Sequence, residues 1–153
     1  MPQEMFGQAR NPVEQKICDI EKQIIDLRKK IVDLRTALPA EKIEDYTVKS
    51  LDKNGAPTTL SKLFGPHDEM ILIHNMGPGC AYCTLWADGI NAWVPYINSR
   101  CALVLESDQD PARWRHFVEG RGWKFQVVSS IDSSLKRDLG YQDKPGNQPG
   151  AST

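Results

Sequence analysis

The chain has 153 residues, of which 40% are hydrophobic and 25% charged, and a formal net charge of −1. These values predict one globular domain with a buried core, and they exclude the strongly basic surface that binding to nucleic acid or anionic membranes requires. No apolar stretch reaches the roughly 20 residues of a membrane span, and residues 1–6 lack the pattern of a secretory signal, so we expect a cytoplasmic protein.

The first predicted element is one long helix over residues 12–38. Pro12 suits a helix start and Pro39 a helix stop. Apolar residues recur at alternating spacings of four and three, which makes a narrow heptad seam. The seam consists of Val13, Ile17, Ile20, Ile24, Leu27, Ile31, Leu34 and Leu38. Three arrangements stay open: the helix forms a homodimer with a second copy, packs on its own domain, or packs on another partner.

After this helix, predicted strands alternate with predicted helical segments. In chain order they are a strand at 46–51, a turn at 52–55, a helical turn at 59–64, a strand at 70–74, a helix at 81–97, a strand at 102–105, a helix at 110–119, a strand at 125–128 and a short helix at 131–139. The alternation predicts parallel βαβ units with helices on both faces of a sheet. We therefore expect a helical extension at 1–40, an α/β domain at 41–140, and a Gly- and Pro-rich segment without further elements at 141–153.

Some details of these helices can also be predicted. Pro95 should kink or shorten the helix at 81–97. Its apolar stripe, expected in the core, contains Leu85, Trp86, Ile90, Trp93 and Ile97. Ser130 or Asp132 should cap the last helix, and Gly140 should end it.

The main functional signal is Cys80-Ala81-Tyr82-Cys83, placed between an apolar strand with a Gly-Pro-Gly loop and a helix. At a helix start, unpaired backbone N–H groups and the positive end of the helix dipole stabilise the thiolate of Cys80. Cys83 is close enough to form a disulfide with it. A Cys-x-x-Cys pair in a βαβ context is typical of thioredoxin-like redox motifs. We interpret the pair as a redox-active dithiol.

The pair has two other interpretations. A structural zinc site needs four ligands, usually in two pairs. The remaining cysteines, Cys18 and Cys101, stand alone, and no second pair of ligands is visible, so we predict no metal. The pair could also be two buried thiols without chemistry. Cys101 opens a strand and is expected to be an inert core thiol, whereas Cys18 lies one position off the helix seam.

Four residues near the dithiol are candidates for supporting roles. His74 could tune the thiolate as an imidazolium, although a packing role is preferred. Trp86 is a second candidate for tuning, although its spacing places it in the core. Asp88 could accept the proton of the resolving thiol or be a solvated helix residue. Tyr82 is expected to be exposed and to contact a substrate or partner.

Residues 44–46, Gly55 and the segment 59–65 resemble the entry to peroxiredoxin- and TlpA-like thioredoxin folds. More specifically, the chain resembles a bacterial thioredoxin-like family of unknown function, related to the alkyl hydroperoxide reductase/thiol-specific antioxidant folds. The similar blocks are Arg35-Thr36-Ala37-Leu38-Pro39, Ile73-His74-Asn75-Met76, Gly79-Cys80-Ala81-Tyr82-Cys83-Thr84-Leu85-Trp86-Ala87-Asp88-Gly89 and Gly122-Trp123-Lys124-Phe125-Gln126-Val127-Val128-Ser129-Ser130.

The resemblance implies an α/β thioredoxin-like fold with a long added N-terminal helix. It also implies that Pro149 matches the proline that such folds hold in cis beside the dithiol, where it would contact substrate. The hairpin and closing helix that should follow are absent up to Thr153. Either the chain continues in the natural protein or something else completes the sheet edge.

We therefore expect a thiol–disulfide oxidoreductase or antioxidant protein without a bound cofactor. Cys80 would attack a disulfide-containing protein, a small thiol or a peroxide, and Cys83 would resolve the intermediate. A thioredoxin- or glutathione-type reductant would restore the dithiol. The alternatives are a thiol peroxidase, with Arg100 or Arg121 stabilising the Cys80 thiolate, and a non-enzymatic dimerisation or binding module built on the long helix.

Overall fold

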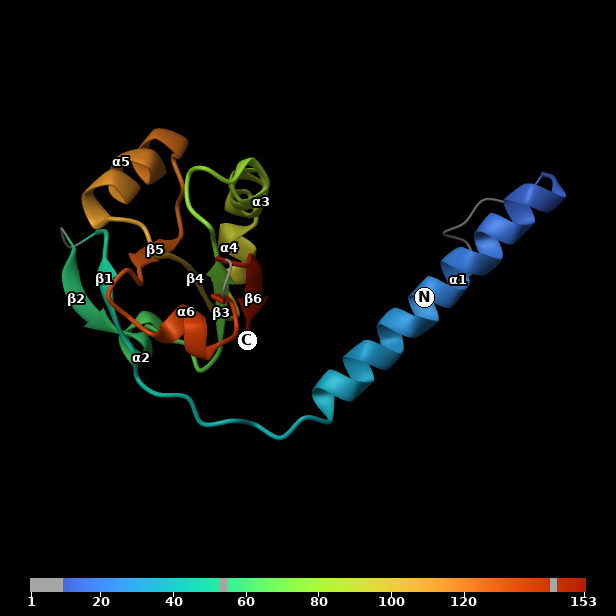
Figure 1. Cartoon of the computed structure of the whole chain (residues 1–153), viewed down its shortest axis with the longest axis horizontal. Coiled ribbons are helices and arrows are strands. Elements are labelled where there is room, and N and C mark those ends of the chain that lie inside the picture. Colours follow the sequence, from blue (N-terminus) through green and yellow to red (C-terminus); the bar gives the residue numbers. More distant parts are fainter. Residues whose placement is uncertain (1–9, 53–54, 144–145) are drawn as a thin grey trace. The chain divides into compact units, whose positions relative to one another are not determined.

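Figure 1 shows the computed structural model of the chain, which describes residues 10–52, 55–143 and 146–153. Contacts divide the chain into two compact units, Met1–Ile43 and Glu44–Thr153. Residues 1–6, where no secretory signal is expected, lie outside the described residues. The same holds for residues 53 and 54, at the centre of the turn predicted at 52–55. None of the described helices combines the length and the apolar character that crossing a membrane requires.

The first unit contains helix α1, Pro12–Thr36. Asn11 caps its start, because its Oδ1 accepts hydrogen bonds from the N–H groups of Val13 at 3.0 Å and Glu14 at 2.9 Å. The predicted start is confirmed, and the helix ends two residues earlier than expected. No residue of α1 is buried, and even Ile24 in the apolar seam is 43% exposed.

The second unit is built on a six-stranded sheet with the order β2-β1-β5-β4-β3-β6. The strands are β1 Thr47–Ser50, β2 Ala56–Thr59, β3 Met70–His74, β4 Ala102–Ser107, β5 Gln126–Ser129 and β6 Gly150–Ser152. β3, β4 and β5 are parallel, as the βαβ prediction requires. β1, β2 and β6 each pair antiparallel with a neighbour, so the sheet as a whole is mixed.

Helices cover both faces of this sheet, with α3 and α5 on one side and α2 and α6 on the other (Figure 1). The helices are α2 Leu60–Leu63, α3 Ala81–Asn91, α4 Val94–Ile97, α5 Pro111–Arg121 and α6 Leu135–Asp138. Successive side chains of a strand point to opposite faces. In β4, Val104 therefore enters one core, while Leu103 and Leu105 enter the other.

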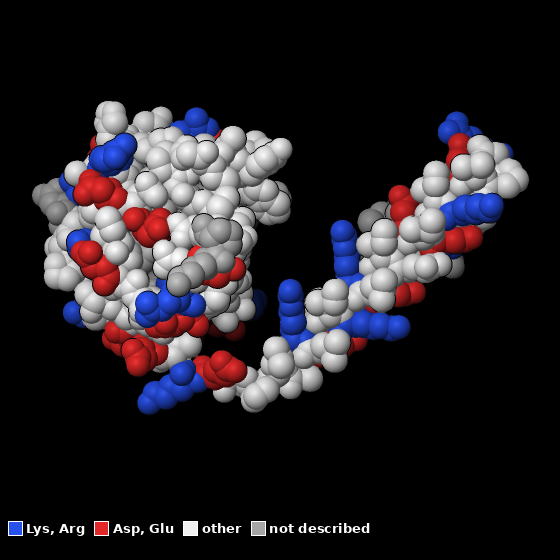
Figure 2. Space-filling model, viewed as in Figure 1, with Lys and Arg blue, Asp and Glu red and all other residues white. Residues whose placement is uncertain are grey.

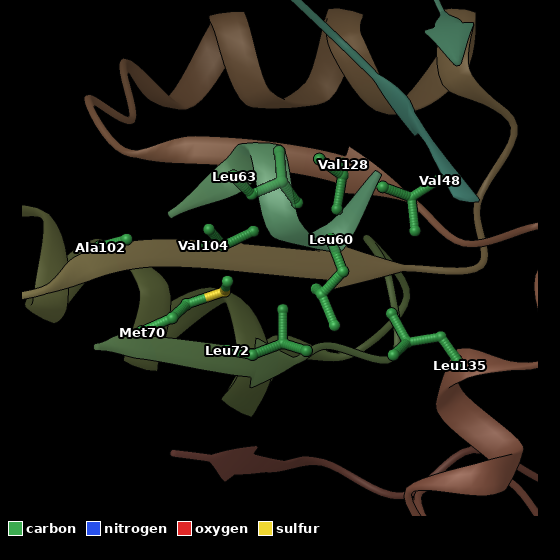
Figure 3. Packing of buried hydrophobic residues seen from close by; sticks show 9 residues of the cluster. All are labelled: Val48, Leu60, Leu63, Met70, Leu72, Ala102, Val104, Val128 and Leu135. Atoms are coloured by element: carbon green, nitrogen blue, oxygen red, sulfur yellow. The ribbon is translucent and has the colours of Figure 1, made fainter. Parts of the chain in front are cut away.

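The first core lies between the sheet and helices α2 and α6. Figure 3 shows Leu72 of β3 and Val104 of β4 gathered with Leu60 and Leu63 of α2. Leu135, the first residue of α6, is fully buried in the same cluster. Burying an aliphatic side chain of this size contributes about 1.5–3 kcal/mol, so these contacts hold the short helices α2 and α6 on the sheet.

The second core is rich in aromatic side chains. The Trp114 ring stacks on Phe117 with ring centroids 5.5 Å apart and meets Trp123 edge-on at 5.8 Å. Ala87 of α3 and Val94 of α4 are buried in the same cluster. This core therefore attaches the helix that begins at the cysteines to the sheet.

The prediction for residues 81–97 was correct in part. The helix stops at Asn91, in keeping with the shortening expected from Pro95, which stands in the first turn of a separate short helix, α4. Of the stripe expected in the core, Ile90 and Ile97 pack against the second core, whereas Leu85, Trp86 and Trp93 are 62–71% exposed. The buried residues of this helix are Cys83 and Ala87, both of which are small. Apolar residues lie all around this helix, so periodicity could not select the buried face.

The segments at the two edges of the sheet also differ from expectation. Residues 56–58, for which no element was predicted, and Thr59, expected to begin a helical turn, form β2 and pair with β1. Residues 150–152, expected to lack regular structure, form β6 and pair antiparallel with β3. The short helix predicted at 131–139 begins only at Leu135, and its N-cap residue, Ser134, makes no side-chain cap hydrogen bond. The predicted caps have other partners: the Ser130 hydroxyl donates to Glu106, and Asp132 pairs with Lys49.

Candidate active site

The loop between β3 and α3 places Cys80 at the start of the helix. Asn75 directly follows β3, and its N–H donates to the carbonyl of Glu106 at 2.9 Å. The Asn75 Oδ1 accepts from the N–H of Gly77 at 2.6 Å. Gly77 has φ +94°, which favours glycine, and a Cβ there would lie 2.6 Å from the Gln109 side chain. The N–H of Cys80 then donates to the Gly77 carbonyl at 3.1 Å, which completes the turn.

Cys80 is the N-cap residue of α3. Its Sγ accepts a hydrogen bond from the backbone N–H of Cys83 at 3.1 Å. Its carbonyl accepts from the N–H and the hydroxyl of Thr84, each at 3.1 Å. The residue is partly exposed, and its sulfur occupies the place of a capping oxygen, where helix N–H groups and the helix dipole stabilise negative charge.

Cys83 differs sharply from Cys80. It lies one turn into α3, is only 8% exposed and belongs to the core. Burial raises the pKa of its thiol, and the hydrogen bond with Cys80 raises this pKa further. The backbone of Met76 and the positive charge of Lys136 act in the opposite direction on the same pKa. Both cysteines are free thiols in this structure.

The two cysteines line an apolar cavity of about 630 Å³. Its walls come from β3, β4, β6, α3, α4 and the loop before Cys80. They include Ile71, Ile73, Met76, Trp86, Ile90, Ile97, Leu103 and Ala151. An apolar substrate group could therefore lie against either thiol without burying a charge.

His74 occupies a packing position, as preferred from the sequence. It is 1% exposed, and its Nδ1 lies 2.7 Å from Oε1 of Glu106. Its Nε2 shares a hydrogen bond of 2.9 Å with Oγ of Ser152, and its ring stacks on Tyr141 with centroids 3.7 Å apart. The histidine also lines the cavity, so it joins the C-terminal strand to the site.

A buried polar network beneath the loop was missed in the sequence. Glu106 is fully buried, and its Oε2 accepts from the Ser130 hydroxyl at 2.6 Å. Lys136 is 1% exposed, lies 3.5 Å from the Glu106 carboxylate and donates to the carbonyl of Asn75 at 2.6 Å. The sequence contains one signal for this network, because the charged residue Glu106 directly follows an apolar run. Nothing in the sequence pattern distinguishes Lys136 from the surface lysines.

Tyr82, predicted to be exposed, and Trp86, wrongly expected in the core, are both exposed on α3 beside the cavity. Tyr82 is 78% exposed and Trp86 71% exposed, and both line the cavity. Figure 2 shows the face over α3 without charged side chains in this view, in contrast to the mixed charges below it. The dithiol therefore opens on an uncharged, aromatic surface.

Asp88 does not lie at the dithiol cavity. Its Oδ1 accepts from Nε1 of Trp123 at 2.8 Å, and its carboxylate also pairs with Arg121. The partners of its carboxylate are therefore Trp123 and Arg121, so it is not a freely solvated residue. It joins α3 to the segment after α5, and it connects the two sequence blocks Trp-Ala-Asp-Gly and Gly-Trp.

The remaining predicted site residues are placed as follows. Pro149 lines the cavity next to β6, but the expected cis bond is not present, since all peptide bonds of the described residues are trans. Cys101 is half-buried just before β4, and Cys18 is half-buried on α1. Among the described residues, no group of three or more His, Cys, Asp or Glu side chains is arranged to hold a metal ion.

A family model described as "Bacterial protein of unknown function (DUF899)" matches residues 6–152. The chain belongs to this family. No curated protein matches it. Family membership confirms the resemblance seen in the motif blocks around the cysteines and around Trp123.

Solved structures with a similar fold extend the comparison of this DUF899 chain. A cysteine-to-serine mutant of Xanthomonas campestris peroxiredoxin Q gives a TM-score of 0.55 at 20% identity over 63% of this chain and 60% of that one. Mycobacterium tuberculosis peroxidoxin BcpB gives 0.59 at 16% identity over 71% and 70%. A secreted M. tuberculosis disulfide oxidoreductase homologous to E. coli DsbE gives 0.53 at 16% identity over 71% and 82%.

These likenesses show the fold. The DUF899 chain has the predicted α/β thioredoxin-like fold, with the added helix α1 before it. The match spans 60% of the length of two of the peroxiredoxin Q structures.

Proposed function

We propose that this DUF899 protein is a thiol–disulfide oxidoreductase in which Cys80 is the nucleophile and Cys83 the resolving thiol. One observation carries the proposal: the two sulfurs of one turn have opposite environments. Cys80 is partly exposed and its Sγ accepts a helix N–H, while Cys83 is buried and burial raises the pKa of its thiol. A dithiol reductant needs this division of roles.

The reaction balances with these two residues. The Cys80 thiolate attacks one sulfur of a substrate disulfide, the S–S bond breaks, and the released thiolate takes up a proton. Cys83 then loses its proton and attacks Cys80 Sγ, which releases the second substrate thiol and leaves a Cys80–Cys83 disulfide. Two electrons have passed from the protein to the substrate.

A reductant of the thioredoxin or glutathione type would restore the dithiol, and the cycle needs no bound cofactor. A cytoplasmic location would favour this direction, because that compartment keeps thiols reduced. We propose that Tyr82, Trp86 and Pro149 contact the substrate, because all three line the cavity that the thiols share. His74 is proposed to position the loop through Glu106, whose carbonyl holds Asn75.

Insulin-disulfide reduction by the full chain tests the proposal. Wild-type protein should reduce insulin, Cys80→Ser should abolish the activity, and Cys83→Ser should accumulate mixed disulfides at Cys80. Cys101→Ser is the matched control, since this half-buried thiol lies before β4 and away from the helix start, and it should retain full activity. Wild-type exchange no faster than that of free cysteine at every redox poise would refute the assignment.

A thiol peroxidase is the second candidate, favoured by the partly exposed Cys80 at an apolar cavity. Cys80 would attack a hydroperoxide to form a sulfenic acid and an alcohol, and Cys83 would condense with the sulfenic acid and release water. Arg121, one of the two arginines predicted to assist, is paired with Asp88 instead. Stopped-flow reaction with hydrogen peroxide distinguishes the candidates: a rate no better than that of free cysteine eliminates the peroxidase.

A further inference from the structure

Helix α1 presents an apolar seam that its own unit leaves uncovered. The helix has 25 residues, about 37 Å at 1.5 Å per residue, and none of them is buried. Exposed large side chains follow the seam over its whole length: Val13, Ile17, Ile20, Ile24, Leu27, Ile31 and Leu34. Isolated helices are marginally stable in water, and a seam of this kind is normally covered by another helix.

The seam fits one heptad assignment. Ile17, Ile24 and Ile31 occupy position a, and position d holds Val13, Ile20, Leu27 and Leu34. A seam made of positions a and d has the width that one facing helix covers. The core residues therefore favour one facing helix, and the flanking charges must set its direction.

The charges beside the seam are divided along the helix. Position e carries Glu14 and Glu21 in the first half and Arg28 and Arg35 in the second half. Position g carries Lys16, Gln23 and Lys30. The residues at position e are therefore acidic in the first half of the helix and basic in the second half. When two copies of the helix run in opposite directions, the acidic half of each faces the basic half of the other.

We propose that α1 pairs with α1 of a second copy as an antiparallel coiled coil. In that arrangement each a residue faces a d residue, so Ile24 lies opposite Leu27 of the second copy. Position e then faces position e. Glu21 meets Arg28 and Glu14 meets Arg35, and twofold symmetry makes each pair twice.

Within the described residues, Glu21 and Arg28 have no ion-pair partner in their own helix, so both are available for this contact. Glu14 already pairs with Arg10 at 3.2 Å at the start of the same helix, so the outer pairs contribute less than the central ones.

The parallel arrangement is disfavoured by the same charges. In a parallel pair, position g faces position e of the next heptad in the partner helix. Lys16 would meet Glu21, which is favourable, but Lys30 would meet Arg35, which is repulsive. The two contacts offset one another. In the antiparallel pair, Lys16 faces Ala37 and Lys30 faces Gln23, so no like charges meet.

Sedimentation equilibrium of the full chain tests both the association and its direction. Wild-type protein should be a dimer, and Glu21→Arg should weaken the dimer about tenfold or more, because two attractive contacts become repulsive. The swap Glu21→Arg/Arg28→Glu should restore the wild-type dissociation constant, since arginine and glutamate then meet again in the antiparallel pair. Lys22→Glu, on the outer face of the helix at position f, is the charge control and should leave the dimer unchanged.

Each other outcome overturns the proposal. A wild-type monomer at all accessible concentrations would mean that α1 packs on its own chain or on another partner. If Glu21→Arg weakens the dimer and the swap Glu21→Arg/Arg28→Glu does not restore it, the two helices pair in parallel. In that arrangement the introduced arginine faces Lys16 in both variants. A Glu21→Arg dimer as tight as wild type would mean that position e lies outside the contact. None of these results depends on the thiol chemistry.

Discussion

The ammonium of Lys136 lies 3.5 Å from the carboxylate of Glu106, and both side chains are almost fully excluded from solvent. The same ammonium donates to the carbonyl of Asn75 at 2.6 Å, in the loop that leads to Cys80. Its charge also lowers the pKa of Cys83, against the effect of burial. This pair therefore connects the end of the central strands with both the loop and the resolving thiol.

Replacing Lys136 by methionine should affect stability and chemistry together. Loss of one partner leaves Glu106 without its cation, which should reduce the free energy of unfolding by about 3 kcal/mol. Because Lys136 lowers the pKa of Cys83, the variant should also resolve mixed disulfides with a pH profile shifted upward. Denaturant titration and the pH dependence of mixed-disulfide release measure the two effects. Lys124→Met, at an exposed position, is the control, and an unshifted pH profile would confine Lys136 to a structural role.

The raised pKa of Cys83 should make the stability of the reduced protein depend on pH. The folded state holds this proton more tightly than the unfolded chain, whose cysteine pKa is about 8.5. Stability from this group is therefore complete below about pH 8.5 and falls as pH rises toward the folded pKa, by at most about 1.4 kcal/mol per pH unit. Denaturant titrations between about pH 7 and 10 should show a smaller decline for Cys83→Ala. Parallel curves for the two proteins would contradict the prediction.

Asp88→Asn distinguishes a structural role of Asp88 from the role in proton transfer that the sequence suggested. The amide retains an oxygen for Trp123 Nε1 but loses the charge that pairs with Arg121. We expect a loss of about 1 kcal/mol in stability and unchanged kinetics of disulfide exchange. A large fall in the rate of the Cys83 step, measured as persistence of the mixed disulfide, would return Asp88 to the mechanism.

Gly150→Ala should loosen β6. A Cβ at this position would lie 2.2 Å from Cε1 of Tyr141, whose ring stacks on His74. The ring must move, and such overpacking typically costs about 1–3 kcal/mol. Amide hydrogen exchange in β3, which pairs with β6, should become faster. Gly146→Ala has nothing within 4 Å of its Cβ and is the matched control, so equal effects of the two changes would argue against the steric explanation.

The parts of the fold that were predicted correctly have strong local signals. β3 has the predicted bounds because its apolar run is short and bordered by a Gly-Pro-Gly loop. α5 begins at the predicted Asp110-Pro111, since the Asp110 carboxylate accepts from two N–H groups of the first turn and proline suits that turn. The helix start beneath Cys80 was predicted from the same kind of local information.

The parts that were missed depend on contacts between distant residues. β6 is a strand only because β3 offers it an edge, and its own three residues show no strand pattern. Trp86 has the spacing of a core residue, yet it is 71% exposed, while the neighbouring Ala87 is only 1% exposed. Lys136 is buried because Glu106, 30 positions earlier in the chain, supplies a carboxylate, and no local pattern reports such a pairing.

The chain carries four tryptophans, and they fall into two groups. Trp114 and Trp123 are buried in the aromatic core, while Trp86 and Trp93 are 71% and 62% exposed. The intrinsic fluorescence therefore has a shielded blue component and a solvent-quenched red one. Because Trp86 borders the cavity that holds both sulfurs, we expect the red component to change when the dithiol is oxidised, so that the reaction can be followed without any added dye.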